Sequence, residues 1–355
     1  MELSFWEQSL PFEYPFTISN GRTKTHQHSL MVRLSLGNWE GFGEAPAIVY
    51  YGVTVQDMME KLVLHQKMIE KFALIDPARF WHFLHHLLPQ DPFLVCALDM
   101  AAWDLWGQMK RKPLHSLWNT EWHTNAQDTN AKLPPICDYT LGIDSIEKMV
   151  QKMEAHPWPI YKVKVGTEYD IEMIAALRQH TNVPIRVDAN AGWTTEEALI
   201  KIPALAKLGV ELVEQPLAKD NWEGMELLKK HSILPLFADE SCVFEKDVAV
   251  CANYFDGINI KLTKCSGPTP ALRMIQEARS LGLKVMMGSM NESVIGSAAI
   301  AQFLPQLDYV DMDGPLLMTE WNGVGLNYAF ENSNGKIEPL TGYGLGVQYR
   351  TPFVK

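Results

Sequence analysis

VPIRVDANAGWTTEEALIKIPALAKLGVELVEQPL, residues 183–217, contains one strand–helix–strand unit of this 355-residue chain. Its first and last segments, VPIRVDAN and VELVEQPL, are short apolar runs of the kind that forms buried strands. Between them, the apolar residues of TEEALIKIPALAKLG recur at helical spacing. A strand, a helix and a further strand in this order predict two parallel strands joined by a helix.

The same alternation continues on both sides of this unit. Helical segments such as SIEKMVQKMEA (145–155) and ALRMIQEARSLG (271–282) separate further strand candidates. The eight candidates, in chain order, are PICDYTLG (135–142), YKVKVG (161–166), VPIRVDAN (183–190), VELVEQPL (210–217), PLFADES (235–241), INIKLTK (258–264), KVMMGSM (284–290) and YVDMDGP (309–315). Seven helices between eight strands predict an α/β barrel of parallel strands, with its active site at their carboxyl ends.

The chain ahead of these strands follows a different pattern. Strand-like segments such as HSLMVRLSL (28–36) and WEGFGEAP (39–46) come first, and helical segments follow them. In FLVCALDMAAWDLWG (93–107), apolar residues recur every three or four positions, and Gly107 is expected to end this helix. We therefore expect an α+β domain ahead of the barrel.

The composition argues against two classes of partner, nucleic acids and membranes. The 42 Asp and Glu residues exceed the 31 Lys and Arg residues, which argues against a nucleic-acid partner because a phosphate backbone requires a basic face. No apolar run approaches the roughly 20 residues that cross a bilayer, and the first ten residues lack the pattern of a secretory signal. The five scattered cysteines contain no CxxC pair and are expected to be reduced and mostly buried. We expect a cytoplasmic protein with no membrane partner.

Three carboxylates occupy equivalent places at the ends of neighbouring strands. Asp188, Glu214 and Asp239 are 26 and 25 residues apart, which is one strand–helix unit each. A single acid at a strand end is commonly a helix cap or a salt-bridge partner, but three at one height repel one another unless a cation neutralises them. Oxygen ligands without Cys or His indicate a hard ion, and we expect Mg²⁺, one per subunit.

The lysines follow the same logic. Lys162 and Lys164 lie two residues apart in YKVKVG, so both point to one face of that strand. Lys261 lies in the sixth strand, opposite the second strand in an eight-stranded ring. A lone lysine there is commonly a salt-bridge partner. Two opposed lysines beside a metal site are suited to removing a proton from one face of a carbon and returning one to the other.

The eighth strand ends in an aspartate pair. Asp311 and Asp313 are spaced to project to one side, opposite the fourth strand and therefore across the cavity from Glu214. If a carboxylate substrate binds the metal, its far end reaches these two acids, which would accept an ammonium group. The alternative is a hydrated pair of acids at a strand end.

These motifs together resemble a known family. KVKVG, RVDANAGW, VEQPL, FADES, NIKLTKCSG and DMDGP, in this order and spacing, resemble the muconate-lactonising subgroup of the enolase superfamily, and the final aspartate pair resembles its dipeptide epimerases. WEGFGEAP and ALDMAAWDLWG resemble the capping domain of that family. The resemblance implies a modified (β/α)7β barrel at residues 126–325, an α+β capping domain at 1–125, and a segment at 326–355 that returns to the cap.

The resemblance also implies a reaction and roles. Sites of the enolase superfamily pair a Lys or His base with Mg²⁺ that stabilises an enediolate. A dipeptide substrate would be inverted at the α-carbon of its C-terminal residue by proton transfer between two bases. The implied roles are Asp188, Glu214 and Asp239 as Mg²⁺ ligands, Lys164 and Lys261 as the two bases, Lys162 as a contact of the substrate carboxylate or enediolate, and Asp311 and Asp313 as ligands of the dipeptide ammonium.

Three further positions are expected to contact the substrate. Thr140 resembles a position that touches the substrate carboxylate, and Met290, after the seventh strand, would border the substrate. Arg22 lies in TISNGRTKTHQH (17–28), where the cap of the family closes the site, and with neighbours such as Lys24 it would select a dipeptide side chain. The alternative for this loop is a solvated turn with no ligand contact.

Two other functions remain open from the sequence. A lyase or cycloisomerase, such as o-succinylbenzoate synthase or muconate cycloisomerase, would use the same metal and lysines, although its substrate has no ammonium for DMDGP to bind. A non-catalytic metal-binding barrel would retain the fold but has no need of two opposed bases. The preferred dipeptide and the pathway stay undetermined, and a homo-oligomer is compatible with the sequence.

Overall fold

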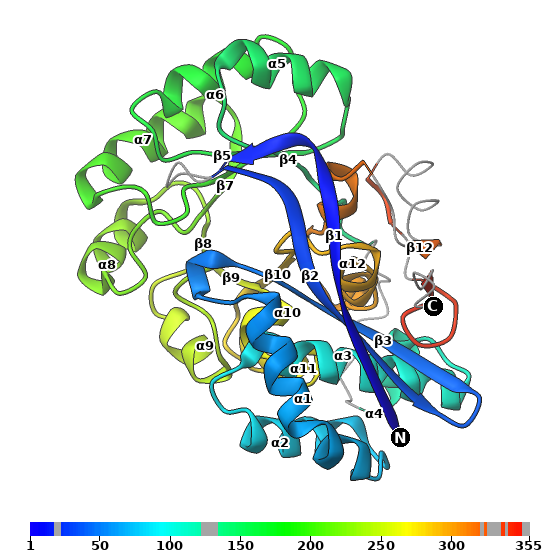
Figure 1. Ribbon diagram of the computed structural model, residues 1–355. Coiled ribbons are helices and arrows are strands. Elements are labelled where there is room, and N and C mark those ends of the chain that lie inside the picture. Colours follow the sequence, from blue (N-terminus) through cyan, green and yellow to red (C-terminus); the bar gives the residue numbers. More distant parts are fainter. Residues whose placement is uncertain (18–22, 122–133, 320–322, 325–334, 338–339, 350–355) are drawn as a thin grey trace.

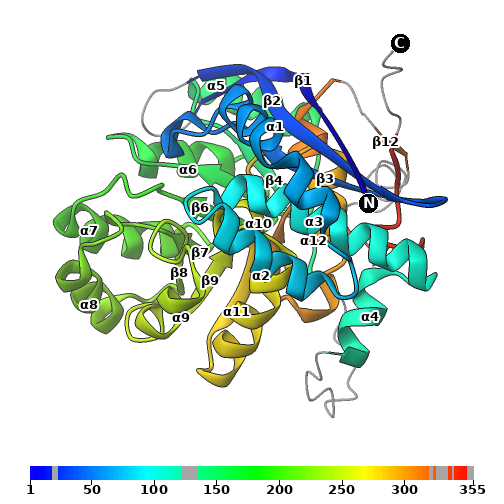
Figure 2. The ribbon, with the colours of Figure 1, turned by 60° about the horizontal axis from the view of Figure 1, so that its bottom comes forward.

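The computed structural model describes residues 1–17, 23–121, 134–319, 323–324, 335–337 and 340–349. These residues form an eight-stranded parallel sheet that curls into a nearly closed barrel, and a separate three-stranded antiparallel sheet. Figures 1 and 2 show the antiparallel sheet and the N-terminal helices gathered against one side of the barrel. The expected fold class, an α/β barrel with an N-terminal α+β domain, is confirmed.

The N-terminal domain, called the cap below, is built on a sheet in the order β1–β2–β3. A Cβ atom on Gly43 would lie 1.9 Å from the carbonyl oxygen of Ala97, so the absent side chain lets a helix pack directly on this sheet. The elements of the cap are β1 (Glu2–Thr17), β2 (Thr23–Leu36), β3 (Trp39–Pro46), η1 (Val49–Tyr51), α1 (Val55–Lys71), α2 (Pro77–Leu87), α3 (Pro92–Lys110) and α4 (Leu114–Glu121).

The long helix α3 does not end where the sequence predicts. It continues past Gly107 to Lys110, and Arg111 follows in the left-handed conformation with φ 53°. Gly107 is instead a packing position, because a Cβ atom there would lie 2.5 Å from the Cα atom of Gly344. The prediction that Gly107 ends the helix was therefore wrong. Its missing side chain instead lets the segment around Gly344 pack against α3.

The barrel strands lie at the eight predicted positions, each hydrogen-bonded in parallel to its neighbours along the chain. They are β4 (Tyr139–Leu141), β5 (Tyr161–Lys164), β6 (Ile185–Asp188), β7 (Val210–Glu214), β8 (Leu236–Ala238), β9 (Gly257–Ile260), β10 (Lys284–Gly288) and β11 (Tyr309–Asp311). The helices between and around them are α5 (Ile146–Ala155), α6 (Asp170–Arg178), α7 (Thr195–Lys207), α8 (Trp222–His231), α9 (Glu245–Cys251), α10 (Leu262–Cys265), α11 (Pro268–Ser280), α12 (Val294–Ala301), η2 (Leu304–Gln306) and η3 (Gly314–Leu317). A small hairpin pairs β12 (Gly323–Val324) with β13 (Gln348–Tyr349).

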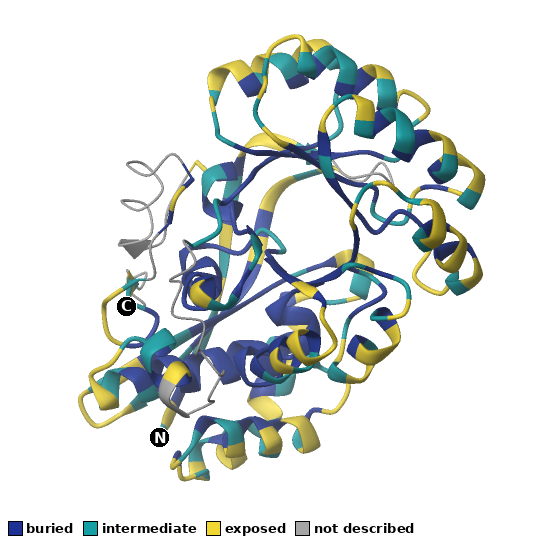
Figure 3. Ribbon diagram, turned by 180° about the vertical axis from the view of Figure 1, so that it is seen from behind, coloured by how far each residue is buried: buried dark blue, intermediate teal, exposed yellow. Residues whose placement is uncertain are grey.

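The first and last strands close the barrel through few contacts. Cys137, just before β4, forms an isolated parallel bridge with Val310 of β11, and the backbone N–H of Met312 points to the Cys137 sulfur at 3.4 Å. Figure 3 shows the strands as a buried ring, while the surrounding helices carry exposed residues on their outer faces. The side chains at the carboxyl ends of these strands are therefore surrounded by buried structure.

The segment at 340–349 packs against the cap. Asp104 of α3 accepts hydrogen bonds from the backbone N–H groups of Phe42 at 2.9 Å and Leu345 at 2.8 Å. The ring of Tyr349 lies 5.8 Å from that of Trp6. The expected domain boundaries at 125/126 and 325/326 lie outside the described residues and stay predictions.

Two expectations about the whole chain can be compared with the structure. All five cysteines are free and buried, as expected. Among the described residues, no helix combines the length and apolar character needed to cross a membrane.

Candidate active site

Three carboxylates converge at the carboxyl ends of adjacent strands. Asp188 ends β6 and Glu214 ends β7, and the two are direct partners in the strand register. Asp239 follows β8 by one residue. All three are buried, and each offers an oxygen within 4.8 Å of the others. Within the described parts of the chain, this is the one group of three or more His, Cys, Asp or Glu side chains placed to hold a metal ion.

Lysines surround these carboxylates. Lys162 Nζ lies 2.8 Å from Glu214 Oε2 and 3.2 Å from Asp188 Oδ2. On the same strand, Lys164 Nζ lies 2.6 Å from Asp188 Oδ2. Lys261, directly after β9, places its Nζ 2.9 Å from Asp239 Oδ2. Positive charge therefore reaches the acidic cluster from β5 on one side and from β9 on the other.

These contacts change the protonation of the carboxylates. Although burial raises the pKa of Asp188, the ammonium groups of Lys164 and Lys162 lower it to about 2. Burial likewise opposes ionisation of Asp239, but Lys261 and Lys264 hold its pKa below its ordinary range. The pKa of the Lys261 ammonium is raised, because Asp239 outweighs the effect of burial. Both aspartates are therefore anionic near neutral pH.

Two buried side chains to which the sequence prediction gave no role form hydrogen bonds with the carboxylate cluster. Lys264 donates from Nζ to the backbone oxygen of Asp239 at 2.6 Å and also to its carboxylate. Asn259 donates from Nδ2 to Glu214 Oε1 at 2.7 Å. Both residues lie in INIKLTK, and the i, i+2 spacing of Asn259 and Lys261 on one strand face is the signal that could have identified the asparagine.

A further buried carboxylate, that of Asp170, organises the loops that follow β5 and β6. Asp170 Oδ1 accepts the backbone N–H groups of Gly166 at 3.0 Å and Thr167 at 2.8 Å. Its Oδ2 accepts Trp193 Nε1 at 2.7 Å and Lys201 Nζ at 2.8 Å. This carboxylate joins the loop after Lys164 to the loop after Asp188.

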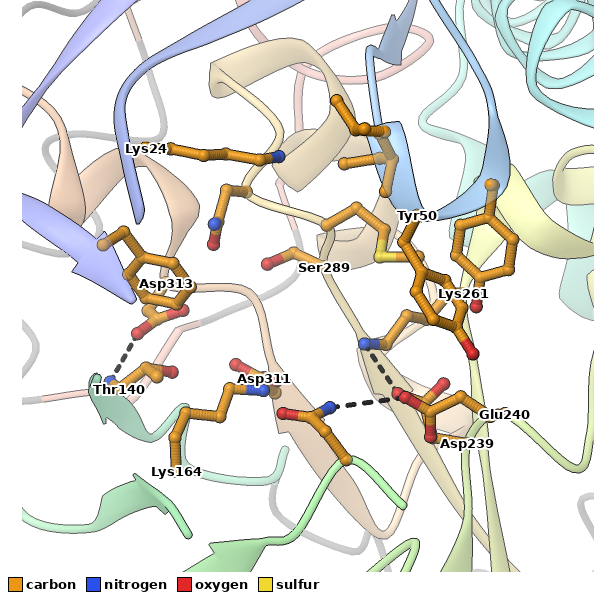
Figure 4. Close-up of a pocket in the computed structure, with 17 residues that line it drawn as sticks. Lys24, Tyr50, Thr140, Lys164, Asp239, Glu240, Lys261, Ser289, Asp311 and Asp313 are labelled. Atoms are coloured by element: carbon orange, nitrogen blue, oxygen red, sulfur yellow. Dashed lines mark hydrogen bonds and ion pairs between the residues drawn. The ribbon is translucent and has the colours of Figure 1, made fainter. Parts of the chain in front are cut away.

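A cavity of about 210 Å³ opens between these strand ends and the cap (Figure 4). Figure 4 shows the side chains of Lys164 and Lys261 entering it from different sides. The barrel contributes Thr140, Lys164, Asn190, Asp239, Glu240, Lys261, Ser289, Met290, Asn291, Asp311 and Asp313 to the lining. The cap contributes Phe16, Lys24, Ile48, Val49, Tyr50 and Tyr51.

The aspartate pair after β11 borders the same cavity. Asp311 Oδ2 lies 2.7 Å from Lys162 Nζ, which connects it to the metal-ligand candidates. Asp313 Oδ2 accepts the backbone N–H of Thr140 at 2.6 Å. Burial and the neighbouring Asp311 raise the pKa of Asp313 to about 7. An ammonium group at this end of the cavity would lie near both Asp311 and Asp313. Its positive charge would favour the ionised form of Asp313.

Comparison with known proteins decides the family. A family model described as enolase C-terminal domain-like matches residues 144–352, more than half of the chain. The chain belongs to the enolase superfamily. The L-Ala-D/L-amino acid epimerase of Flavobacterium johnsoniae is 47% identical to it over 340 residues, covering 94% of this chain and 98% of that protein.

Solved structures place this enolase-superfamily member with dipeptide epimerases. The substrate-liganded L-Ala-D/L-Glu epimerase of Bacillus subtilis superposes with a TM-score of 0.88 at 28% identity, covering 99% of this chain and 100% of that one. The dipeptide epimerase of Enterococcus faecalis V583, complexed with Mg and the dipeptide L-Leu-L-Tyr, gives 0.87 at 27% identity over 98% and 99% of the two chains. The predicted family and its dipeptide epimerase group are confirmed.

The predicted site residues of this superfamily member fall into three groups. Lys164, Lys261, Asp239, Thr140, Met290, Asp311 and Asp313 line the cavity. Lys162, Asp188 and Glu214 are buried and are not among its lining residues, and each of the two carboxylates lies within 3.2 Å of Lys162 Nζ. Arg22 lies outside the described residues. The roles of all these residues stay predictions.

The sequence prediction missed most of the wall that the cap supplies. Ile48, Val49, Tyr50 and Tyr51 border the cavity from a short 3₁₀ turn after β3. The left-handed Gly52 ends this turn. The apolar run IVYYG behind a strand was the available signal, but nothing in its spacing says that it faces the barrel.

Proposed function

We propose that this protein is a Mg²⁺-dependent dipeptide epimerase that inverts the α-carbon of the C-terminal residue. The observation that carries this proposal is the placement of Lys164 and Lys261 in one cavity, on strands four apart in the ring and beside a buried carboxylate triad. Proton removal on one face and return on the other requires two such groups. The names of the relatives support the same activity.

The triad fits one Mg²⁺ ion per chain. Asp188, Glu214 and Asp239 offer only oxygen atoms, which are the ligands that hard cations prefer. Asp188 and Asp239 have depressed pKa values and are ready to bind a cation without first losing a proton. When bound, Mg²⁺ would stabilise the negative charge that develops on the substrate carboxylate as the α-proton leaves.

The two lysines divide the proton transfer between them. In one direction Lys164, as a neutral amine, takes the α-proton and becomes an ammonium. Lys261, held as an ammonium beside Asp239, gives a proton to the opposite face of the same carbon and becomes a neutral amine. The reverse reaction exchanges these roles, and the carbon returns to four bonds with inverted configuration.

Lys162 has a different part in this proposal. Burial alone lowers the pKa of its ammonium, but the carboxylates of Asp311, Glu214 and Asp188 hold it well above its ordinary range. It therefore stays charged and does not exchange protons with substrate. We assign it to holding the triad together and to placing positive charge near the developing enediolate.

The ends of the cavity suggest how a dipeptide would lie. Its ammonium would meet Asp311 and Asp313, and its C-terminal α-carbon would lie between Lys164 and Lys261. The cap would enclose the side chains. Lys24 lines the cavity and is half-buried, and desolvation lowers the pKa of its ammonium. Among the described residues, no carboxylate pairs with it. A carboxylate on the substrate would give this ammonium a partner, so we propose a preference for an acidic side chain.

The test is isotope incorporation. The protein with Mg²⁺ is incubated in D₂O with a library of dipeptides, and mass spectrometry follows the gain of one deuterium at the C-terminal α-carbon. We expect exchange together with inversion for a subset of dipeptides. If no dipeptide exchanges while o-succinylbenzoate forms from its precursor, the epimerase proposal is wrong and the lyase alternative replaces it.

A further inference from the structure

A buried carboxylate joins the cap to the barrel outside the catalytic cluster. Glu44 of β3 is completely buried. Its Oε1 accepts the backbone N–H of Ser293 at 2.9 Å, and its Oε2 accepts the Ser293 hydroxyl at 2.6 Å and the backbone N–H of Gly296 at 3.1 Å. Among the described residues, no lysine, arginine or histidine pairs with Glu44. The side chain of Ser29 in β2 is a further hydrogen-bond partner, and burial raises the pKa of Glu44 while the bonds from Ser293, Ser29 and Gly296 lower it. The first turn of α12 therefore supplies most of the donors that hold this buried carboxyl group.

The segment directly before α12 forms one wall of the cavity. Ser289, Met290 and Asn291 all line it. The backbone N–H of Met290 donates to Glu292 Oε2, and the side chain of Met290 packs against the hydrophobic cluster of the cap. The cap therefore contacts this wall through the methionine side chain, and contacts the start of the following helix through Glu44.

Two glycines show how little room this junction has. A Cβ atom on Gly296 would lie 2.5 Å from Glu292 Cγ and 3.4 Å from Glu44 Oε2, so the two carboxylic side chains meet at this glycine. A Cβ atom on Gly314, within DMDGP, would lie 2.4 Å from the backbone oxygen of Glu292. The wall is therefore confined between the cap strand and the turn that carries Asp313, and a shift of α12 would be transmitted to both.

We propose that Glu44 is a positioning residue: by anchoring Ser293 and Gly296 it sets the position of the 289–291 wall against the substrate. Without the carboxylate, two backbone N–H groups and a hydroxyl lose their acceptor in a buried place, and the start of α12 must move or admit water to satisfy them. Because the wall is continuous with that helix, its side chains move with it. The kinetic consequence rests on the proposed epimerase function, while the anchoring of the wall does not.

The experiment compares Glu44→Ala and Glu44→Gln with Glu40→Ala. Glu40 lies on the same strand but is half-exposed and pairs with Arg33 at the surface, so its removal controls for loss of a β3 carboxylate. Hydrogen–deuterium exchange read by mass spectrometry measures protection of peptides that cover 286–301 and, for reference, β6 to β8. Initial rates on the best dipeptide from the library give kcat and KM for each folded variant.

For Glu44→Ala we expect exchange in 289–296 to rise about tenfold, the effect of losing one or two buried hydrogen bonds, with β6 to β8 unchanged. KM should rise about tenfold while kcat changes less than twofold, because the lysines and the triad are not displaced. Glu44→Gln keeps one acceptor oxygen and should recover part of both effects, and Glu40→Ala should match the wild type.

Two results would overturn the proposal. One is a folded Glu44→Ala protein with wild-type protection at 289–296 and wild-type KM. The other is an equal rise of exchange in all peptides, which would mean that Glu44 serves global stability alone. If the wild-type chain turns over no dipeptide, the proposed function fails by itself, and the exchange pattern still decides whether Glu44 anchors the wall.

Discussion

Glu292 should make the stability of this protein fall as the pH rises through neutrality. Burial and the nearby Glu44 carboxylate raise the pKa of Glu292 from its ordinary 4.5 to about 7. The folded chain therefore keeps this carboxyl protonated over a range where the unfolded chain has lost the proton. Stability from the protonated group is complete below about pH 4.5 and is lost progressively as the pH rises through about 7.

The size of this effect follows from the two pKa values. Each tenfold difference in proton affinity is about 1.4 kcal/mol, so a rise from 4.5 to about 7 corresponds to about 3 kcal/mol when both states are deprotonated. Between pH 6 and pH 8, the free energy of unfolding should fall by about 1.4 kcal/mol because of this group. That is a substantial fraction of the 5–15 kcal/mol by which domains are typically stable.

Glu292→Gln removes the titration while keeping the shape and an acceptor oxygen for the N–H of Met290. We expect the variant to gain about 1.4 kcal/mol relative to the wild type on going from pH 6 to pH 8. Urea unfolding at both pH values, followed by tryptophan fluorescence, measures this difference. Glu40→Gln, at an exposed position of β3, serves as the control.

Parallel behaviour of the wild type and Glu292→Gln between pH 6 and pH 8 would refute the reasoning. The reasoning would also be refuted if the stability of Glu292→Gln relative to the wild type fell as the pH rises. That result would mean that the buried surroundings stabilise the ionised form of Glu292 and lower its pKa.

The remaining expectations concern the site and the C-terminal segment. Lys164→Ala and Lys261→Ala should each lower epimerisation at least about 100-fold, with α-proton exchange in D₂O surviving from opposite stereoisomers; turnover near the wild-type rate in either variant would contradict the two-base scheme. Chelation with EDTA should abolish turnover, and added Mg²⁺ should restore it and raise the melting temperature; activity that survives thorough chelation would exclude the metal role. Gly344→Ala should destabilise the fold by about 2 kcal/mol or more, because φ is +64° and a Cβ atom would lie 2.0 Å from Asp104 Oδ1; an unchanged urea midpoint would contradict this packing. Lys24→Ala should lower kcat/KM for dipeptides with an acidic side chain about tenfold and leave neutral ones nearly unchanged; equal losses for both would remove Lys24 from specificity.

The motif residues could be placed from the sequence because strand and helix lengths repeat. In a parallel barrel, each unit returns the chain to the same edge, so Asp188, Glu214 and Asp239 had to arrive at similar heights. Strand periodicity directed Lys162 and Lys164 to one face, and the strand count put Lys261 across from them. None of these steps needs knowledge of contacts between distant segments.

Contacts between the cap and the barrel could not be predicted from local spacing. Glu44 and Ser293 are 249 residues apart, and no periodicity in either segment indicates that they meet. Gly107 had the position of a helix terminator and turned out to make room for Gly344. The expected contact of Lys162 with the substrate carboxylate or enediolate stays a prediction; what only the structure shows is that its ammonium is enclosed among carboxylates and is not among the residues that line the cavity.

By itself, the sequence of this protein determined the fold class, the order of the strands and the chemical groups at their ends, because these depend on local spacing that repeats along the chain. The tertiary structure decided which of those groups face the cavity, how the cap closes it and which carboxylates are held protonated. Those properties depend on burial and on pairs such as Glu44 with Ser293, and burial is set only when distant segments pack together.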